Sequence, residues 1–412
     1  MSLDGPTKGT WTITASRPVH YEVRQIDDAL HGTFPIPAEG SPERDILGRT
    51  PGGSVRRLVV IDRNVLRLYG EPIRAFLARH EIEWRMCVLP GGERTKRLRN
   101  VVKLWKAMDR FGLDRRREPL LVWGGGASTD TAGLAASVYR RDLPRIEFPT
   151  TLVGMVDASL GVKRPIDFNG YKNRLCGLSA PDVVIADRRM LRTVSARSLN
   201  DGAAEVLKVA VVLDAELFAR LEIDGPTVLA EKFQGITPAG ERAALAILGG
   251  GIGGQLGDLH DNLFEEWLYK KTFGGHTVSP AIEMEALRRA RSWLPWRRRG
   301  VLLHGEAVAL DLALSVVIAM HRGLLSPEDC ERVLVLEERL GLPVSDSLFE
   351  DGALLARGLA ETVRHRDGKQ RWPLPDAIGS VTYADDVGPH EMSRATRYLR
   401  ERPRHGAARR AA

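Results

Sequence analysis

Cysteine is scarce in this chain, and its scarcity excludes two common kinds of site. The 412 residues include three cysteines, Cys87, Cys176 and Cys330, and none stands in a Cys-x-x-Cys pair. We therefore expect neither a disulfide framework nor a thiolate zinc site, and a reducing cytoplasm suits the chain. No apolar run reaches the length of a membrane span, and the N-terminal MSLDGPTKGTW lacks the apolar core of a secretion signal.

Sequence motifs for nucleic-acid binding are also absent, although the chain is basic. The excess behind its net charge of +7 is concentrated in Arg288–Arg299 and in the tail Arg394–Arg410. No recognition helix, zinc finger or RNA-binding motif accompanies these segments, so we expect no nucleic-acid partner. An anionic substrate explains the charge more simply. The composition, 43% hydrophobic and 27% charged, is that of an ordinary soluble globular protein, and the length suits two domains.

Segments of strand length alternate with segments of helix length through the first half of the chain. Trp11–Ile26 predicts two short strands interrupted by a proline, and residues 32–55 predict a loop. The elements predicted beyond them are the strands Arg57–Asp62, Trp84–Leu89, Pro119–Trp123, Arg145–Phe148 and Asp182–Ala186, and the helices Val65–Arg79, Thr95–Phe111 and Thr129–Val138. This alternation is typical of a parallel, doubly wound sheet.

Helical patterns dominate from Ala196 onward. The predicted helices are Gly202–Leu221, Pro238–Leu248, His304–His321 and Pro327–Leu340. We therefore predict an α/β fold with an N-terminal, Rossmann-like, doubly wound parallel sheet domain over residues 1–190. A mostly α-helical domain follows over residues 191–412 and ends in a disordered basic tail. We expect the active site in the cleft between the two domains.

A glycine-rich turn, Gly124–Gly126, follows one predicted strand and precedes a predicted helix. Glycine lets the backbone approach a pyrophosphate closely, and a helix N-terminus offers free N–H groups, so the turn suits a dinucleotide. A tight connection without a ligand remains the alternative. Asp62 ends the first strand, where a carboxylate can bind ribose hydroxyls or cap the next helix. Gly91–Lys96 ends the second strand and could meet the other side of a nucleotide.

A second glycine cluster, Gly249–Gly254, follows a helical stretch and not a strand. We expect it to end or break a helix rather than to bind phosphate.

One carboxylate and two imidazoles, Glu205, His276 and His304, form a candidate metal site. Such a set leaves an open position for substrate, as catalytic zinc sites do. Because the three residues are far apart in sequence, spacing alone does not identify them as ligands, and packed or surface histidines remain the alternative. A basic set of residues can likewise be interpreted in two ways, as a phosphate-binding site or as a solvated surface. Its members are Arg141, Lys163, Lys172 and Lys208, with Asn173 beside Lys172.

Taken together, these residues resemble the sugar phosphate cyclases, the family of dehydroquinate synthase. The resemblance covers roughly Trp11 to Asp386 and is carried by GGGASTDTAG, PTTLVGMVDASLGVK, GYKN, NDGAAEVLK and LLHGEAVALD. The motifs are highly specific in combination, and no single one is. Within the family the chain looks most like the 2-epi-5-epi-valiolone synthases, by DFNGYKNRL, DRRMLRT, HTVSP and VRHRDGKQRWPLP. Dehydroquinate synthases usually carry a second histidine where this chain has Pro280, and a lysine pair at His365–Asp367.

The resemblance implies a lyase that acts on sedoheptulose 7-phosphate with bound NAD and Zn²⁺ or Co²⁺. The implied sequence is a transient oxidation by NAD, β-elimination of phosphate, re-reduction and intramolecular aldol closure, without net redox change. A homodimer is also implied, because the family shares its phosphate site between two subunits. No membrane or nucleic-acid partner is implied.

The resemblance also assigns residues. Those implied to bind NAD are Asp62, Asn64, Glu93, Lys96, Gly125, Gly126, Ala127, Asp130, Thr150, Thr151, Lys172 and Thr193. Those implied in catalysis are Asp157, Lys163, Lys172, Asn173 and Lys208, and those implied to bind substrate or its phosphate are Arg141, Lys163, Asn173, Lys208 and Lys271. Glu205, His276 and His304 match the zinc ligands.

Three departures from the family pattern leave alternatives open. First, Thr272–His276 either contains an inserted glycine or lacks an acidic substrate contact. Second, the segment between His276 and His304 is longer than is usual in the family. Third, Gly249–Gly254 falls where members of the family have a helix. The alternatives are a sister cyclase that makes another epimer, such as 2-epi-valiolone, a 3-dehydroquinate synthase, a metal- and NAD-dependent polyol dehydrogenase, and a non-catalytic cofactor-binding protein with a broken metal site.

Overall fold

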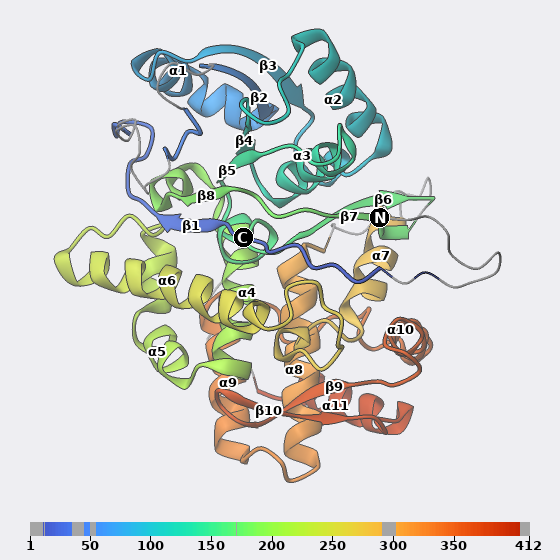
Figure 1. Cartoon of the computed structure of the whole chain (residues 1–412). Coiled ribbons are helices and arrows are strands. Elements are labelled where there is room, and N and C mark those ends of the chain that lie inside the picture. Colours follow the sequence, from blue (N-terminus) through green and yellow to red (C-terminus); the bar gives the residue numbers. More distant parts are fainter. Residues whose placement is uncertain are drawn as a thin grey trace.

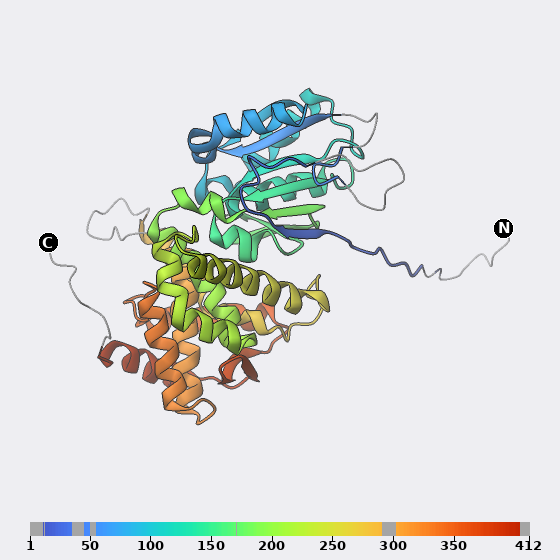
Figure 2. The same ribbon diagram turned by 90° about the vertical axis from the view of Figure 1, so that its left-hand side faces the viewer.

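The computed structural model describes residues 11, 13–34, 45–49, 55–169, 171–290 and 302–403. It consists of a sheet half and a helical half, stacked one on the other in both views (Figures 1 and 2). The end of the basic tail, for which we predicted disorder, and most of Arg288–Arg299 lie outside the described residues.

A parallel six-stranded sheet forms the first half, as predicted. Across the sheet its strands are β1 (Glu22–Gln25), β8 (Val183–Ala186), β5 (Arg145–Pro149), β4 (Leu120–Gly124), β2 (Arg56–Asp62) and β3 (Glu83–Leu89). The prediction of two strands within Trp11–Ile26 was wrong for the described residues, because only β1 pairs with a neighbour, β8.

The sheet is doubly wound, with apolar side chains buried on both faces. Val59 and Trp123 pack with α1 (Arg63–Arg79), whereas Val60 and Val122 pack on the opposite face. The helices on that opposite face are α2 (Leu98–Phe111) and α3 (Gly126–Val138). Strands buried on both faces read as continuous apolar runs, which is why the sequence showed them clearly.

Two antiparallel hairpins were not predicted. Their strands are β6 (Lys163–Phe168) with β7 (Tyr171–Leu178), and β9 (Trp372–Ala377) with β10 (Ser380–Ala384). The first hairpin extends from the sheet half toward α7 (Figure 1). It carries three of the lysine and asparagine residues singled out above, so it belongs to the wall of the site.

The second half is mostly helical, as predicted. Its helices are α4 (Ala196–Leu213), α5 (Ala215–Ala230), α6 (Pro238–His260), α7 (Ser279–Ala290), α8 (His304–His321), α9 (Pro327–Arg339), α10 (Gly352–His365) and α11 (Pro389–Glu401). The single helix predicted over Gly202–Leu221 is two helices, because Asp214 accepts hydrogen bonds from the N–H groups of Glu216 and Leu217 and so caps α5.

The glycine run Gly249–Gly254 does not end a helix, so that prediction was wrong. It lies inside α6, which continues to His260. A Cβ at Gly254 would lie 2.3 Å from Val209 of α4, and one at Gly250 would lie 2.8 Å from Leu217 of α5. The run therefore lets α6 pack closely on α4 and α5, and this close packing outweighs the low helix propensity of glycine.

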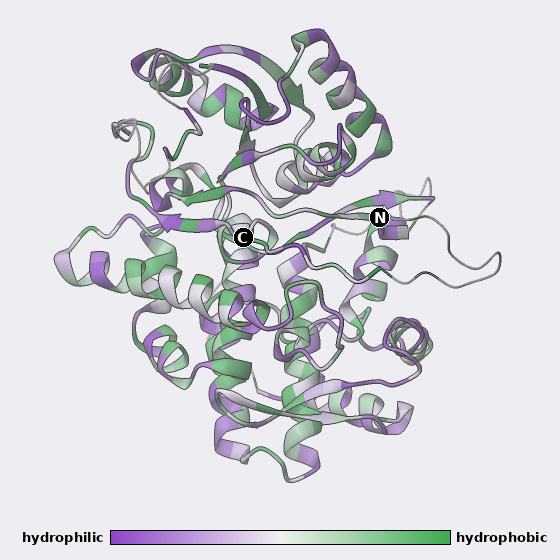
Figure 3. Cartoon of the chain, viewed as in Figure 1, coloured by the Kyte–Doolittle hydropathy of each residue, from purple (hydrophilic) through white to green (hydrophobic). Residues whose placement is uncertain are grey.

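Helix α8 qualifies the expectation that no apolar run reaches membrane length. Over 18 residues its mean hydropathy is 1.3, enough for a span by length and composition, but 78% of that window is buried in the structure. Figure 3 colours much of α8 as hydrophobic. The helix packs against α4, α7, α9 and α11, so it forms the core of the helical half.

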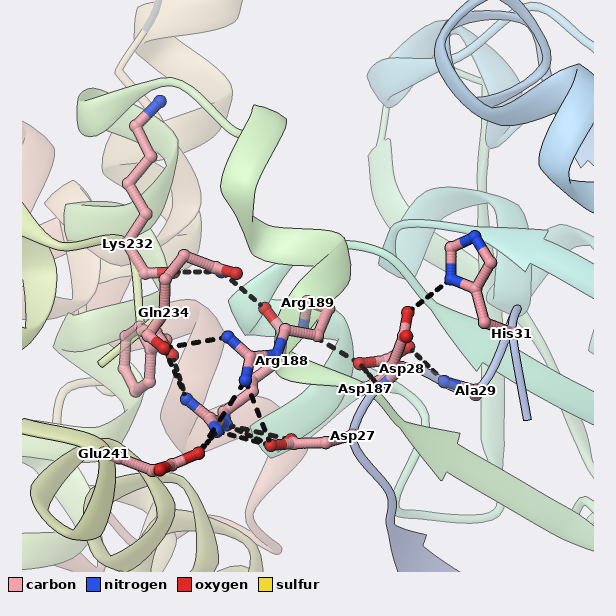
Figure 4. A network of polar contacts seen from close by, with 11 residues as sticks. Asp27, Asp28, Ala29, His31, Asp187, Arg188, Arg189, Lys232, Gln234 and Glu241 are labelled. Carbon is pink, nitrogen blue, oxygen red and sulfur yellow. Dashed lines mark hydrogen bonds and ion pairs between the residues drawn. The ribbon is translucent and has the colours of Figure 1, made fainter. Parts of the chain in front are cut away.

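Arg188 connects the two halves. It opens the 3₁₀ turn η3 (Arg188–Thr193), which links β8 to α4, and its side chain is fully buried. Its guanidinium donates to Asp27 at 2.8 Å, to the carbonyl of Phe233 at 2.8 Å and to Glu241 at 2.7 Å (Figure 4). Because Asp27 follows β1 while the other two acceptors belong to the helical half, one buried cation fixes the halves to each other.

Candidate active site

A cavity of about 590 Å³ lies where the carboxyl ends of the central strands meet the helical half. The register of the parallel strands places Gly124 of β4 beside Pro149 of β5, so the turns that follow both strands reach the cavity together. Helices α6, α7 and α8 supply the facing wall. A site at the carboxyl end of a parallel sheet is the usual location for ligands in such folds.

The glycine turn after β4 is shaped by close packing. A Cβ at Gly125 would lie 2.9 Å from Thr151, and a Cβ at Gly126 would lie 2.8 Å from Ala158. Both glycines therefore allow the turn to lie tightly on the neighbouring loop, and the N-terminus of α3 opens into the cavity. Free N–H groups at a helix N-terminus suit a pyrophosphate.

Asp62 fits both of the roles considered for it. Its carboxylate accepts a hydrogen bond from the N–H of Asn64 at 2.7 Å and so caps α1. It also lines the cavity, as does Asn64. Gly91, with φ of +87°, lies so close that a Cβ there would be 2.9 Å from the Asp62 carboxylate.

Lys96 and Asp130 form a buried ion pair at 2.9 Å on the same wall. Burial alone would lower the pKa of Lys96, but Asp130 and Glu93 outweigh it and raise the pKa. Burial likewise opposes ionisation of Glu93, but Lys172 and Lys96 hold its pKa below the ordinary value. These charges fix one another in place at the cavity wall.

Two lysines of the β6–β7 hairpin contact acidic residues of the helical half. Lys163 pairs with Glu265, and Lys172 pairs with Glu283. Asn173 has φ of +53°, and its N–H donates to the Asp167 carboxylate at 3.1 Å. Lys163, Lys172 and Asn173 all line the cavity, as expected for residues that would hold an anionic substrate.

Lys270, and not Lys271, lies on the cavity wall, which corrects the expected register. Lys270 is buried and pairs with Glu265 at 2.9 Å, which draws it inward. Lys271 begins a short 3₁₀ turn, η4 (Lys271–Phe273), and is exposed outside the wall. Arg141 is likewise exposed, at φ of +69°, and outside the wall. Its role in binding phosphate stays a prediction that would require a neighbouring copy of the chain.

The candidate metal ligands come together as predicted. Glu205 of α4, His276 and His304 offer ligand atoms that all lie within 4.8 Å of one another. The Nε2 atoms of His304 and His276 lie 3.3 and 3.8 Å from Oε1 of Glu205. That oxygen is buried and accepts no hydrogen bond from any residue that the structure describes. A buried acceptor without a donor is costly, and a cation bound there would satisfy it.

Hydrogen bonds behind the ligands fix their orientation. Nδ1 of His276 lies 3.1 Å from the carbonyl of Gly274, and Nδ1 of His304 lies 3.2 Å from Glu283. Each partner accepts a hydrogen bond from Nδ1–H, so each ring is held with its Nε2 lone pair free for a metal. These residues therefore fit zinc.

The acidity of this cluster follows from its burial and charges. Burial opposes ionisation of Glu205, yet Lys208, at 2.5 Å, and the two imidazoles hold its pKa well below the ordinary value. Burial, with the Lys208 cation, lowers the pKa of His276 to about 3. The site therefore presents an ionised carboxylate and a neutral imidazole, which are the forms that bind zinc.

The turn that carries His276 is held from behind by two further charged residues. Asp311 of α8 accepts hydrogen bonds from the N–H groups of Thr277, Val278 and Ser279 at 2.8, 2.6 and 2.8 Å. Arg366 donates to the carbonyl of His276 at 3.2 Å. The altered turn before His276 therefore does not separate the ligand from its partners.

Asp157 lines the cavity near the metal cluster. Gln255 of α6 donates to its carboxylate at 3.1 Å. Burial and the nearby Glu205 raise the pKa of Asp157, and burial raises the pKa of Asp201 to about 6. Both carboxyls line the cavity, so the site contains groups that can hold a proton near a substrate.

Most of the predicted residues share this one cavity. The predicted residues on its wall are Asp62, Asn64, Glu93, Lys96, Gly125, Gly126, Ala127, Asp130, Thr150, Thr151, Asp157, Lys163, Lys172, Asn173, Thr193 and His304. Glu205, His276 and Lys208 are packed behind the wall, in contact with His304 or with one another. Sequence reasoning assigned no role to Asp201, Gln255, Glu265 and Glu283, all of which line the cavity, and it chose Lys271 where Lys270 lines the cavity. Asp201 lies within the motif NDGAAEVLK, a signal that could have identified it. No motif marks the others, because the packing of helices and loops alone brings them there.

Comparison with known proteins gives consistent matches over nearly the whole chain. The family model "3-dehydroquinate synthase N-terminal" matches residues 86–201, and "3-dehydroquinate synthase C-terminal" matches residues 202–361. The 2-epi-5-epi-valiolone synthase of Streptomyces albus is 43% identical over 395 residues, which are 95% of this chain and 90% of that protein. The enzyme of the same name from an Actinoplanes species is 43% identical over 390 residues, 94% of this chain and 92% of that protein.

A solved structure matches the fold closely. It is that of ValA, the 2-epi-5-epi-valiolone synthase of Streptomyces hygroscopicus subsp. jinggangensis 5008, with NAD⁺ and Zn²⁺ bound. The TM-score is 0.83 at 40% sequence identity, and the match covers 95% of this chain and 100% of that one.

Proposed function

The chain belongs to the 3-dehydroquinate synthase family, and from this we propose that it converts sedoheptulose 7-phosphate into 2-epi-5-epi-valiolone with loss of phosphate. One observation carries the proposal: a single cavity combines a glycine turn at a helix N-terminus, a set of lysines and a carboxylate–imidazole cluster. A dinucleotide, a phosphorylated sugar and a metal ion could therefore meet there. The 43% identity to 2-epi-5-epi-valiolone synthases supports this substrate over the carboxylated precursor of dehydroquinate.

We infer that NAD and Zn²⁺ are the cofactors. When bound, NAD supplies a reversible hydride acceptor and zinc polarises a hydroxyl oxygen of the substrate. The residues that would hold the dinucleotide are Asp62, Asn64, Glu93, Lys96, Gly125, Gly126, Ala127, Asp130, Thr150, Thr151, Lys172 and Thr193. Glu205, His276 and His304 would hold the metal through Oε1 and the two Nε2 atoms. The fit of these residues is supported by the orphaned, buried Oε1 of Glu205.

The chain's own residues would bind and orient the substrate. Lys163, Lys172 and Asn173 lie on one wall of the cavity and would hold the anionic phosphate in a fixed position for its departure. Asp157, whose pKa is raised by burial and by Glu205, would keep a proton available beside the substrate hydroxyls. Closure of the carbon ring is an intramolecular aldol addition, in which the proton given up by the enol goes to the new alkoxide oxygen, and it is favoured because both ends of the heptulose stay in one cavity. We further propose a homodimer, in which Arg141 would reach the phosphate bound by the neighbouring copy.

Phosphate release tests the proposal directly. The purified protein is incubated with NAD⁺ and Zn²⁺ or Co²⁺, with sedoheptulose 7-phosphate and the carboxylated dehydroquinate precursor in parallel. We expect phosphate from the heptulose alone, with no lasting change in nicotinamide absorbance, and we expect NMR to identify 2-epi-5-epi-valiolone. Release from the carboxylated precursor alone would refute the substrate assignment. Lasting NADH formation without phosphate release would instead indicate a polyol dehydrogenase.

One observation supports a second candidate product. Thr272 is 3% exposed, donates its hydroxyl to Asp258 at 2.6 Å and lies outside the cavity wall. The turn before His276 therefore presents no acid to the substrate there, which could change the face on which the ring closes. The second candidate is a sister cyclase that makes 2-epi-valiolone from the same substrate, and the same NMR spectrum distinguishes the two epimers.

A further inference from the structure

Glu283 is a buried carboxylate that touches both walls of the cavity. It belongs to α7, is 4% exposed and lines the cavity. Its Oε2 lies 3.2 Å from Nδ1 of His304, and its Oε1 forms an ion pair with Nζ of Lys172. One side chain therefore contacts a candidate metal ligand of α8 and a lysine of the β6–β7 hairpin.

The contact with His304 determines which ring nitrogen is free. Nε2 of His304 faces Glu205 at 3.3 Å, so this nitrogen must be unprotonated when it binds a cation. The proton then resides on Nδ1, and this N–H donates a hydrogen bond to Glu283. A carboxylate in this position fixes the tautomer and the ring orientation and makes the imidazole a better ligand.

The contact with Lys172 satisfies a buried cation. The side chain of Lys172 is 9% exposed, and burial lowers its pKa. A buried ammonium needs a nearby carboxylate, since an unpaired buried charge is strongly destabilising. Glu283 is the carboxylate that pairs with it directly. Without Glu283 we expect the lysine to move away from the cavity wall.

We propose that Glu283 is a positioning residue that couples the two walls: it holds His304 in the tautomer that binds a metal and holds Lys172 at the cavity. Metal loading and the placement of Lys172 would then depend on each other. This inference rests on the metal site of the proposed function and adds a residue that governs how well that site is formed.

The test is the affinity of the whole protein for Zn²⁺, measured by competition with a chromophoric chelator. The main variant is Glu283→Gln, because one amide cannot accept from both partners and its NH₂ group cannot pair with an ammonium. We expect zinc affinity to fall about 10- to 100-fold, as it does when the partners of zinc-bound histidines are changed. The matched control is Glu285→Gln on the same helix, whose carboxylate pairs with Arg288 and Arg289 outside the cavity wall. Its zinc affinity should stay unchanged.

A second measurement separates coupling from a merely structural effect. The zinc affinity of Lys172→Met is compared in the parent and in the Glu283→Gln background. The proposal predicts that the fold-change in zinc affinity caused by Lys172→Met differs between the two backgrounds by roughly threefold or more, since residues in contact are energetically coupled. Equal effects in both backgrounds would refute the coupling.

Folding is checked by circular dichroism and by the melting temperature. If Glu283→Gln does not fold, Glu283→Asp serves instead, because it keeps the charge but is too short to span both contacts. Parent-like zinc affinity in either folded variant overturns the role of Glu283. A parent protein that binds no zinc at all refutes the metal site itself, so the two failures are distinguishable.

Discussion

The two walls of the cavity are built on different principles. The sheet wall is built around the glycine turn after β4, positioned by the register of β4 and β5, and its charges Lys96 and Asp130 pair with each other within that wall. The helical wall and the metal cluster packed behind it present carboxylates and imidazoles from α4, α7, α8 and a turn; Lys208 pairs with Glu205, and Glu283 contacts His304. The glycine turn of the sheet wall therefore depends on the space around its glycines, whereas the metal cluster of the helical half depends on electrostatic partners. Substitutions that affect one wall and spare the other test this distinction.

Removing Glu205 should have the largest effect, because it deletes the buried oxygen on which the metal cluster converges. We expect Glu205→Ala to lose bound zinc and to lower phosphate release by about 10³-fold or more, since a catalytic metal contributes several kcal/mol to the transition state. NAD⁺ affinity, a property of the sheet wall, should be unchanged. Metal analysis, phosphate release and cofactor titration measure the three quantities.

The control for this variant is Glu216→Ala, which removes an exposed carboxylate in the first turn of α5. Because Lys208 loses its ion-pair partner in Glu205→Ala, the isosteric Glu205→Gln should be examined beside it. If folded Glu205→Ala or Glu205→Gln kept full activity and bound zinc, the assignment of Glu205 as a metal ligand would be refuted.

Gly126→Ala should weaken NAD⁺ binding at the sheet wall and leave zinc binding unchanged, the opposite pattern to Glu205→Ala. The added methyl group would lie 2.8 Å from the Cβ of Ala158, so the glycine turn must shift. Overpacking of this kind costs about 1–3 kcal/mol, and we expect it to weaken NAD⁺ binding by about 10- to 100-fold while zinc binding stays intact. Fluorescence titration with NADH and chelator competition measure the two affinities.

A matched glycine is available for this comparison. Gly253 lies in α6, and a Cβ there would meet no atom within 4 Å. Gly253→Ala should leave NAD⁺ binding unchanged and should stabilise the helix by about 1 kcal/mol. If both alanine variants bound NAD⁺ like the parent, packing would not be what shapes the turn.

Asp311→Asn tests whether a charged residue behind the metal cluster supports zinc binding by holding the turn that carries His276. Oδ2 of Asp311 accepts from three N–H groups, whereas its Oδ1 is buried and accepts no hydrogen bond from the described residues. In the variant the NH₂ group would be buried without an acceptor, at a cost of about 1–3 kcal/mol. We expect a lower melting temperature and weaker zinc binding, because the turn that carries His276 loosens. NAD⁺ affinity should not change.

The control is Asp329→Asn, which alters a half-buried carboxylate in the first turn of α9 that pairs with Arg332 outside the cavity wall. A parent-like melting temperature and zinc affinity for Asp311→Asn would show that the three hydrogen bonds do not support the His276 turn.

The same distinction explains what could be predicted from the sequence. The strands of the parallel sheet beyond β1, and the turn after β4, were predictable because apolar runs and a glycine cluster are local signals. The glycine run in α6 was misinterpreted, since its purpose is close packing against Val209 and Leu217, which are distant in sequence. Glu283 was missed, and Lys271 was chosen in place of Lys270, for the same reason: tertiary packing alone determines which charged side chains face the cavity. The metal triad was found only through family motifs, not through spacing.

The smallest effect on the site is expected from Glu337, a buried carboxyl of the helical half that lies outside the cavity wall. Neither of its oxygens forms a hydrogen bond with the described part of the chain, and burial, together with Glu338, raises its pKa well above the ordinary value. The folded state therefore keeps this carboxyl protonated at a pH where the unfolded chain ionises it. Its contribution to stability is greatest below the unfolded pKa and is lost as the pH rises toward the folded one.

Glu337→Gln removes this titration at nearly constant volume. We expect the variant to melt at a higher temperature than the parent at pH 8, with a smaller difference at pH 5, and to retain parent-like zinc binding, NAD⁺ binding and turnover. Glu328→Gln, an exposed carboxylate on the same helix, should show no pH-dependent difference. A difference in melting temperature that stays constant with pH would mean that Glu337 is ionised in the folded protein. In that case the helical half would tolerate Glu337 as a buried carboxylate without a hydrogen-bond donor. The need of a buried charge for an electrostatic partner would then be limited, in this half, to the metal cluster.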